Sequence, residues 1–198
     1  MKGKAITAAV ALAAGLVFGS AALVDKIGEF EDGGAKAFYV VYADKLAAGL
    51  PTGCRGITPH ITDTPMKVGD VWSKAKCDVE TTRALAKVQT ALIRCFRAIP
   101  PQSVFDAATS FAWNVGVAAA CNSGAMRAWN EYGPEAPGLA SSWFKGCRRL
   151  FESDDGRPVW SYVKTGRKLA SGKPEMKFVR GLANRREAEF RYCIGYRS

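Results

Sequence analysis

At 198 residues, the chain has room for one compact domain and a short appendage. It carries 28 Lys and Arg against 18 Asp and Glu, a formal net charge of +10, which predicts attraction to a polyanion such as a nucleic acid, an anionic lipid or an acidic wall polymer. His60 is the only histidine and no two cysteines are close enough to chelate zinc, so the composition argues against a metal centre, and we expect no cofactor.

The first 24 residues form an uncharged segment behind a short basic start. Met1 to Lys4 is basic, and Ala5 to Val24 has no charge. Its length suits a membrane span, but Ala, Gly, Ser and Thr fill most of it, so insertion in a bilayer is expected to be marginal and reversible. A signal peptide cleaved near Ala22 is the alternative. We predict an export segment at residues 1–24 and a domain at residues 25–198.

Six cysteines favour disulfides formed outside the cytosol, with buried free thiols as the alternative. Cys77 and Cys95 fall at opposite ends of one predicted helix, about 27 Å apart at 1.5 Å per residue, and so cannot pair with each other. Cys54 with Cys77 is the first prediction, and the other pairings stay open. The candidates are Cys54, Cys77, Cys95, Cys121, Cys147 and Cys193.

The domain begins with a loop-rich part and continues with helices. Residues 29–74 are rich in Gly, Pro and Thr and predict turns and short strands. Ser73 or Asp78 then caps a long helix to about Arg97, ended by Pro100 and Pro101. Further helices are predicted over residues 103–115, from after Cys121, with Asn122 or Ser123 as the cap, to about Glu131, and over 141–151, 159–170 and 178–192.

Acidic and hydroxyl side chains gather just after the uncharged segment. Hydrolysis of a glycosidic bond needs an acid that protonates the leaving oxygen and a second group that activates water. The stretch from Ile27 to Thr58 offers both, although a solvated surface segment often carries as many such groups. The candidate side chains are Glu29, Glu31, Asp32, Asp44, Thr52 and Thr58.

Several motifs in this stretch resemble the phage-type lysozymes (endolysins) of glycoside hydrolase family 24. "FEDGGAKAF", "YAD" and "GLPTGCRGIT" are similar to a disrupted form of the family's catalytic motif. "FAWNVG" at Phe111 to Gly116 resembles its Phe-x-x-Asn-x-Gly helix end, and "GLANRREAEFRYC" at Gly181 to Cys193 its C-terminal arginine signature. These elements occur in the family's order over most of the chain. The resemblance implies an α+β, lysozyme-like fold, with a small β-containing N-terminal lobe and a larger helical lobe joined by a long helix.

The resemblance implies a role for each matching residue. Glu31 would be the general acid, with Glu29 as its competitor. Asp44 would orient or deprotonate the attacking water, and Thr52 would hold that water. The spacings from Glu31 to Asp44 and from Asp44 to Thr52 exceed the family's, which implies inserted residues in the hairpin.

Three residues are candidates for contact with the substrate. Asn114 lies in the Phe-x-x-Asn-x-Gly motif, Trp143 could stack on a sugar, and Arg186 matches one of the family's C-terminal arginines. Arg186 or Arg185 could also pair with the catalytic glutamate. A plain surface ion pair is the alternative for both arginines.

The implied activity is cleavage of the β-1,4 bond between N-acetylmuramic acid and N-acetylglucosamine in peptidoglycan, by a monomer that lyses the host. Residues 5–24 would tether the enzyme to the inner membrane facing the periplasm until release, as in signal-anchor-release endolysins. Lytic transglycosylase action and non-catalytic cationic disruption of wall or membrane are the alternatives.

The basic stretches 145–149, 164–168 and 184–187 would meet an anionic wall or membrane rather than nucleic acid, or form a solvated basic face.

Overall fold

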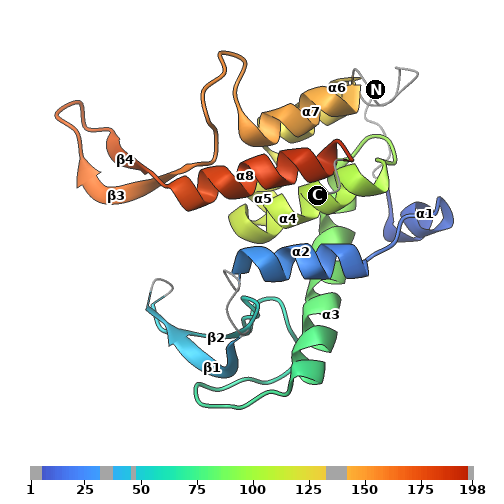
Figure 1. Ribbon diagram of the computed structural model, residues 1–198, viewed down its shortest axis with the longest axis vertical. Helices are drawn as coiled ribbons and strands as arrows, with labels where there is room; N and C mark the ends of the chain where they lie inside the picture. The colour runs from blue at the N-terminus through green and yellow to red at the C-terminus, as the bar shows by residue number, and fades with distance from the viewer. Residues whose placement is uncertain (1–5, 32–37, 46–47, 133–141, 196–198) are drawn as a thin grey trace. The chain divides into compact units, whose positions relative to one another are not determined.

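The computed structural model describes residues 6–31, 38–45, 48–132 and 142–195. The chain divides into two compact units, an N-terminal unit at Thr7–Ile93 and a C-terminal unit from Arg94 onward. Among the described residues there are eight α-helices, one 3-10 helix and two two-stranded antiparallel sheets (Figure 1). This mixture of a small β-containing part, a long helix and a larger helical part confirms the predicted α+β fold.

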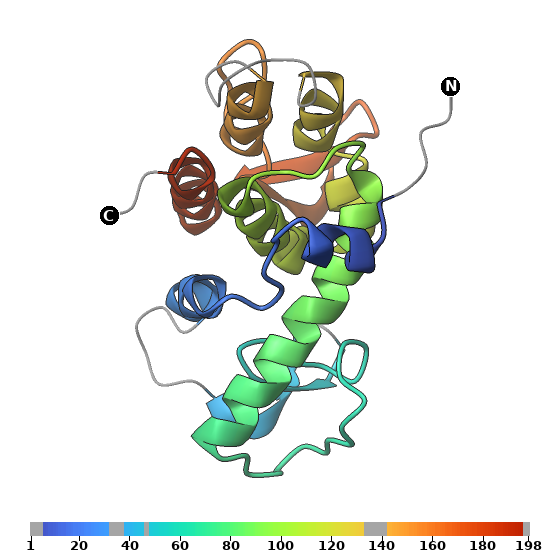
Figure 2. The ribbon, with the colours of Figure 1, turned by 90° about the vertical axis from the view of Figure 1, so that its right-hand side faces the viewer.

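The N-terminal unit is built around helix α3 (Lys74–Leu92), beside which the hairpin of β1 (Phe38–Asp44) and β2 (Leu50–Cys54) lies (Figure 2). Ser73 is the N-cap, and its hydroxyl accepts a hydrogen bond from the backbone N–H of Lys76 at 3.2 Å, as expected for a helix start. Residues 69–72 extend the sheet, since the N–H of Trp72 donates to the carbonyl of Tyr39 at 2.8 Å.

The uncharged N-terminal segment folds as two short helices, α1 (Ala8–Ala13) and the start of α2 (Ala21–Glu31). Gly15 and Gly19 separate them with φ of 87° and 62°, values that glycine adopts readily. Within the described residues, no helix is both long and apolar enough to span a bilayer. The predicted boundary between residues 24 and 25 falls inside α2, so the last residues of the predicted export segment and the first of the predicted domain share one helix.

Helix α2 lies in the N-terminal unit and carries buried apolar side chains. Leu23 and Ile27 are fully buried, and each such side chain contributes about 1.5 to 3 kcal/mol through the hydrophobic effect. The N–H of Gly19, just before the helix, donates to the side-chain oxygen of Gln89 in α3 at 2.7 Å. A Cβ at Gly19 would lie 2.9 Å from the methyl carbon of Thr82, so the chain approaches α3 closely at this glycine.

The C-terminal unit is a helical bundle around α4 (Gln102–Val115), which packs against α8 (Arg180–Cys193). α5 (Val117–Cys121) follows α4, and α6 (Gly124–Tyr132) pairs with α7 (Ser142–Phe151). Phe105 and Trp129 both contact Phe96, whose ring stacks on Trp129 at 5.6 Å between centroids. The 3-10 helix η2 (Ile93–Cys95) leads into this unit.

The predicted helix over residues 159–170 is wrong. The chain forms an antiparallel hairpin there, β3 (Tyr162–Lys168) with β4 (Pro174–Phe178). Val163 and Thr165 are β-branched and favour strands, and Gly166 and Gly172 have φ of 84° and 77°, which fit a bulge and a turn rather than a helix. The expectation of turns from residue 29 is also corrected, because residues 29–31 are the end of α2.

All six cysteines are paired. Cys54 is joined to Cys77, which is the pair that sequence reasoning put first, with 5.4 Å between their Cα atoms. Cys95 is joined to Cys121 and Cys147 to Cys193. The first bond ties the end of β2 to the first turn of α3, and the last ties α7 to α8.

Candidate active site

The β1–β2 hairpin brings two of the predicted catalytic residues to neighbouring positions. Asp44 lies opposite Leu50, and Thr52 lies opposite Tyr42. Residues that face each other across a ladder share a side of the sheet, as do residues two apart along a strand. Asp44 and Thr52 are therefore diagonal neighbours on one side of the hairpin, although eight positions separate them in sequence.

The hydroxyl of Thr52 is held in place by the backbone. Thr52 is 4% exposed, and its Oγ1 donates to the carbonyl of Leu50 at 3.1 Å. This bond uses the hydroxyl hydrogen and leaves oxygen lone pairs that can accept a hydrogen bond from water. The arrangement suits the predicted role of Thr52 as the residue that holds the attacking water.

Asp44 stands at the last position of β1, where the turn begins. Its carbonyl accepts a hydrogen bond from the N–H of Gly49 at 2.7 Å, and Gly49 has a φ of 82°. The strand β2 then begins at Leu50, two positions before Thr52. The longer spacing noticed in the sequence leaves the two residues on the same side of the sheet.

The predicted general acid, Glu31, is the last residue of α2. Its side chain and residues 32–37 lie outside the described part of the chain, so its role stays a prediction. Its competitor Glu29 is 61% exposed and forms an ion pair with Lys26 at 2.7 Å on the helix surface. This arrangement is a plain ion pair on a solvated helix surface, with its partners three positions apart.

Arg55 is a residue near this site that sequence reasoning missed. A Cβ at Gly28 would lie 2.9 Å from the Cζ of Arg55, so the guanidinium lies against the backbone of α2. The same guanidinium is 4.0 Å from the carboxylate of Asp78. Because helix positions three apart are neighbours, Arg55 lies on the turn that leads to Glu31. Glycine inside a helix lowers the stability of the helix by about 1 kcal/mol relative to alanine, so Gly28 is a sequence signal of this close approach.

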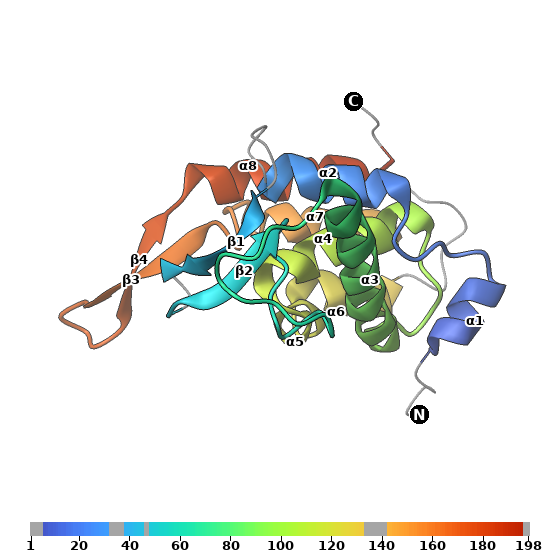
Figure 3. The ribbon, with the colours of Figure 1, turned by 90° about the horizontal axis from the view of Figure 1, so that it is seen from below.

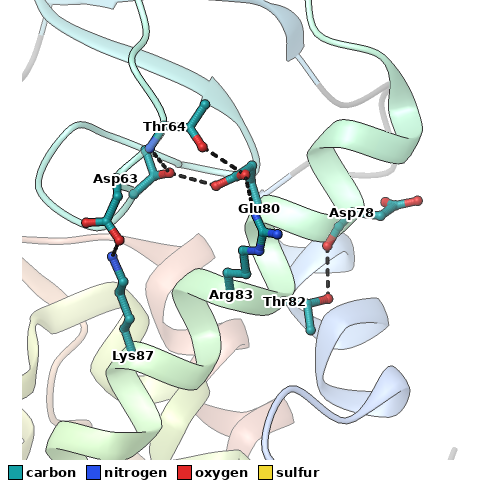
Figure 4. Close-up of polar contacts among 8 residues, drawn as sticks. Asp63, Thr64, Asp78, Glu80, Thr82, Arg83 and Lys87 are labelled. Atoms are coloured by element: carbon teal, nitrogen blue, oxygen red, sulfur yellow. Dashed lines mark hydrogen bonds and ion pairs between the residues drawn. The ribbon is translucent and has the colours of Figure 1, made fainter.

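A buried carboxylate fastens the loop that follows the hairpin (Figure 4). Glu80 of α3 accepts hydrogen bonds from the hydroxyls of Thr62 at 2.7 Å and Thr64 at 2.9 Å, and from Arg83 at 3.1 Å. Beside it, Lys87 pairs with Asp63 at 2.6 Å. Loop 55–73 is thereby attached to α3 at Glu80 and again at Lys87, about two helical turns further along.

The surroundings of Glu80 favour its ionised form. Burial alone would raise the pKa of the Glu80 carboxyl, but the hydrogen bonds from Thr62 and Thr64 and the charge of Arg83 outweigh burial and lower the pKa from its ordinary value of 4.5. Glu80 is therefore an anchoring carboxylate and does not suit the role of a proton donor near neutral pH.

The predicted substrate contacts in the C-terminal unit have different surroundings. Asn114 is exposed in the last turn of α4, which ends before Gly116 at a φ of 87°, as the motif predicted. Trp143 is half-buried in α7, and its carbonyl accepts a hydrogen bond from the indole N–H of Trp129 at 3.2 Å. Both positions stay predictions as substrate contacts.

Arg186 is buried, so the alternative of a plain surface ion pair is corrected, and its contact with the substrate stays a prediction. Arg186 has no exposed surface, and its guanidinium pairs with the Glu189 carboxylate at 2.9 Å and lies 4.9 Å from the ring centre of Phe111. Burial lowers the pKa of Arg186 to about 10, against the opposite effect of Glu189, so the group stays charged near neutral pH. Arg185 also bonds Glu189, at 3.2 Å, and the arginine pair thus holds α8 in the core.

Two hollows in the C-terminal unit, of about 530 and 210 Å³, lie where α7 ends. Their walls are formed largely by ion-paired side chains such as Arg149 and Asp154, and none of the candidate catalytic or substrate-contact residues lines either one. Among the described residues, no group of three His, Cys, Asp or Glu side chains is arranged to hold a metal ion.

Solved structures of similar fold are lysozyme-like. The muramidase domain of SpmX from Asticaccaulis excentricus matches with a TM-score of 0.66 and 19% identity, over 90% of this chain and 97% of that one. The endolysin from Escherichia coli O157:H7 phage FAHEc1 matches with a TM-score of 0.64 and 22% identity, over 90% and 94%. The active form of P1 phage endolysin Lyz matches with a TM-score of 0.53 and 21% identity, over 98% and 96%.

Sequence comparison identifies the family. No curated protein sequence matches the chain significantly. The family model described as phage lysozyme matches residues 36–150, a region that contains Asp44, Thr52, Asn114 and Trp143. Because this match covers more than half of the chain, the protein belongs to the phage lysozyme family.

Proposed function

We propose that the protein is an endolysin of glycoside hydrolase family 24 that cleaves the β-1,4 bond between N-acetylmuramic acid and N-acetylglucosamine to lyse a host cell. Membership of the phage lysozyme family supports a glycoside hydrolase that degrades peptidoglycan. The observation that carries the finer proposal is the placement of Asp44 and Thr52 as diagonal neighbours on one side of the hairpin. In this role the protein acts as a monomer without a cofactor.

The proposed reaction is a single displacement by water. Glu31 donates its proton to the glycosidic oxygen as the bond to the anomeric carbon breaks. Water donates a hydrogen bond to the Thr52 hydroxyl oxygen, loses its other proton to Asp44 and adds to the anomeric carbon, so that the product carries a new reducing end. The acid and the base of such an inverting enzyme stand roughly 6.5 to 9.5 Å apart, which leaves room for the water.

Product analysis separates this reaction from the transglycosylase alternative. A hydrolase adds water and gives reducing N-acetylmuramic acid ends, whereas a transglycosylase gives an anhydro product that is lighter by one water molecule. Purified peptidoglycan digested by the full-length protein should give reducing muropeptides by mass spectrometry. Anhydro products would replace the hydrolase proposal, and the absence of any glycan cleavage would leave cationic disruption.

The second part of the proposal is that residues 5–24 tether the exported enzyme to the inner membrane before release into the periplasm. In support, the segment is uncharged but only weakly apolar, and in the folded protein its Leu16 and Leu23 are buried while Gly19 bonds Gln89. These side chains cannot be in lipid and in the protein core at once. Insertion in the bilayer would therefore remove the first part of α2 from the N-terminal unit and keep the enzyme inactive.

Cell fractionation tests the tether. Expressed in bacteria with an intact membrane potential, the full-length protein should sediment with membranes and move to the soluble periplasmic fraction after the potential is collapsed. Replacing Gly15 and Gly19 by leucine makes the segment more apolar, and this variant should stay in the membrane. Cleavage after Ala22 on export would contradict the tether, and would also remove the first two residues of α2.

A further inference from the structure

The β3–β4 hairpin of the C-terminal unit is exposed on both sides. All seven residues of β3 are exposed, and in β4 only Glu175 is as much as half-buried. Two views agree that the hairpin extends away from the helices of its own unit (Figures 1 and 3). A two-stranded sheet gains little stability from its own contacts, so such an extension needs a reason beyond packing.

The hairpin is strongly basic. Residues 162–180 contain six cations and a single carboxylate, Glu175, which accepts a hydrogen bond from the hydroxyl of Thr165 at 2.6 Å. The cations are Lys164, Arg167, Lys168, Lys173, Lys177 and Arg180. None of the six forms an ion pair with another described residue.

Apolar side chains are exposed beside these cations. The ladder places Tyr162 opposite Phe178, and Lys164 opposite Met176, on one side of the hairpin. The Tyr162 and Phe178 rings meet edge to face at 5.4 Å, yet each side chain is more than 40% exposed, as is Met176. One side of the sheet thus presents a row of apolar groups with a lysine among them.

The turn of the hairpin continues this pattern in a fixed geometry. The N–H of Leu169 donates to the carbonyl of Lys173, and the N–H of Gly172 donates to the carbonyl of Leu169, both at 2.8 Å. Leu169 is 50% exposed between Lys168 and Lys173. An apolar residue is therefore held at the tip with cations on either side.

We propose that the β3–β4 hairpin binds the surface of an anionic phospholipid membrane. Phosphate headgroups would attract the lysines and arginines, while Leu169 and the aromatic side chains would enter the boundary between headgroups and acyl chains. A soluble polyanion or an anionic glycan would complement the cations but would leave Leu169 and Met176 in water. The combination of cations with aliphatic side chains therefore favours the lipid surface. This site is separate from residues 5–24 and independent of the hydrolase reaction.

Vesicle sedimentation tests the proposal with the full-length protein. Vesicles of phosphatidylethanolamine and phosphatidylglycerol supply the anionic surface, and vesicles of phosphatidylcholine serve as the neutral reference. The uncharged segment 5–24 does not discriminate between the two, so the preference for anionic vesicles reports on cationic contacts. This preference should fall as salt concentration rises.

The decisive variant combines Arg167→Gln, Lys168→Gln and Lys173→Gln at the turn. Each cation near an anionic surface contributes about a fivefold gain in partitioning, so the triple variant should bind anionic vesicles on the order of a hundredfold more weakly. The matched control removes three exposed cations elsewhere, Lys67→Gln, Arg94→Gln and Arg97→Gln, and should bind like wild type. Leu169→Ser keeps every charge and should weaken binding severalfold.

Circular dichroism establishes that each variant is folded before it is compared. If the turn variant and the control lose equal amounts of binding to anionic vesicles, only net charge matters and the proposal is overturned. Unchanged binding by the turn variant, or by Leu169→Ser, would also overturn it. So would a wild-type protein that ignores anionic vesicles but binds an anionic wall glycan through the same cations.

Discussion

The hydroxyl of Thr62 donates to the buried carboxylate of Glu80 at 2.7 Å, across 18 positions of sequence. Thr64 adds a second such bond at 2.9 Å, and the Thr62 oxygen in turn accepts a hydrogen bond from the N–H of Thr64 at 3.0 Å. A single carboxylate thus organises the loop that connects the candidate catalytic hairpin to α3.

Replacing Glu80 by glutamine should destabilise the protein. Hydrogen bonds to a charged group contribute about 1.5 to 3 kcal/mol, and the amide nitrogen of glutamine would face a hydroxyl donor without accepting from it. We expect a loss of about 2 to 3 kcal/mol in the free energy of unfolding near neutral pH, measured by urea denaturation. Glu29→Gln, at an exposed ion pair, is the control and should cost less than about 1 kcal/mol.

The Glu80 variant should also change how stability depends on pH. The pKa of Glu80 is lower in the folded protein than in the unfolded chain, where a glutamate titrates at about 4.3. The stabilisation of the folded state by the ionised Glu80 carboxylate is therefore fully present above about pH 4.3. It is lost as the pH falls through the lower pKa that Glu80 has in the folded protein. The difference in stability between wild type and Glu80→Gln should shrink on acidification. A difference that is constant from neutral to acidic pH would contradict the assignment.

Gly146 in α7 should not tolerate a larger side chain. A Cβ at this position would lie 2.0 Å from the Cδ1 of Trp129, inside the core of the C-terminal unit. Gly146→Ala forces the indole or the helix to move and should cost about 1 to 3 kcal/mol. Gly181→Ala in α8, where no heavy atom lies within 4 Å, should be neutral or slightly stabilising. Thermal unfolding compares the two, and similar melting temperatures would contradict the packing described here.

Asp44 and Thr52 should affect turnover more than substrate binding. Asp44→Asn removes the base and Thr52→Val removes the hydroxyl with little change in shape, so each should lower kcat by about 10²-fold or more with a smaller change in KM. Thr82→Val makes the same chemical change at an exposed position of α3 and serves as the control. An unaltered kcat in Thr52→Val would mean that the Thr52 hydroxyl takes no part in the reaction.

Local signals in the sequence predicted much of the fold. The sequence offers Ser73 and Asp78 as caps of the long helix, and Ser73 is the one that caps α3. The Phe-x-x-Asn-x-Gly motif marks the end of α4, because capping residues and glycines act on their immediate neighbours. The pair Cys54–Cys77 is present as predicted, although helix length excludes only the pairing of Cys77 with Cys95 and leaves the other pairings open. These inferences need only local geometry.

The errors arose where tertiary contacts decide. Nothing near Arg186 in the sequence reveals that its guanidinium is buried against Phe111 of α4. Residues 159–170 have apolar side chains at spacings that fit a helix, but β-branched residues and two glycines favoured the hairpin. Arg55 was missed because its contact with Gly28 joins two segments 27 positions apart.

The central claim is that Glu31 is the general acid of a peptidoglycan hydrolase. The most direct measurement is turbidity clearing of outer-membrane-permeabilised Gram-negative cells by full-length wild type, Glu31→Gln and Glu29→Gln. Glutamine is almost the same size as glutamate but cannot donate the proton, whereas net charge changes equally in both variants. We predict clearing by wild type and Glu29→Gln and at least a 10²-fold slower rate for Glu31→Gln. Equal clearing by all three proteins would contradict the account and indicate cationic disruption, and loss of clearing in Glu29→Gln alone would identify Glu29 as the acid.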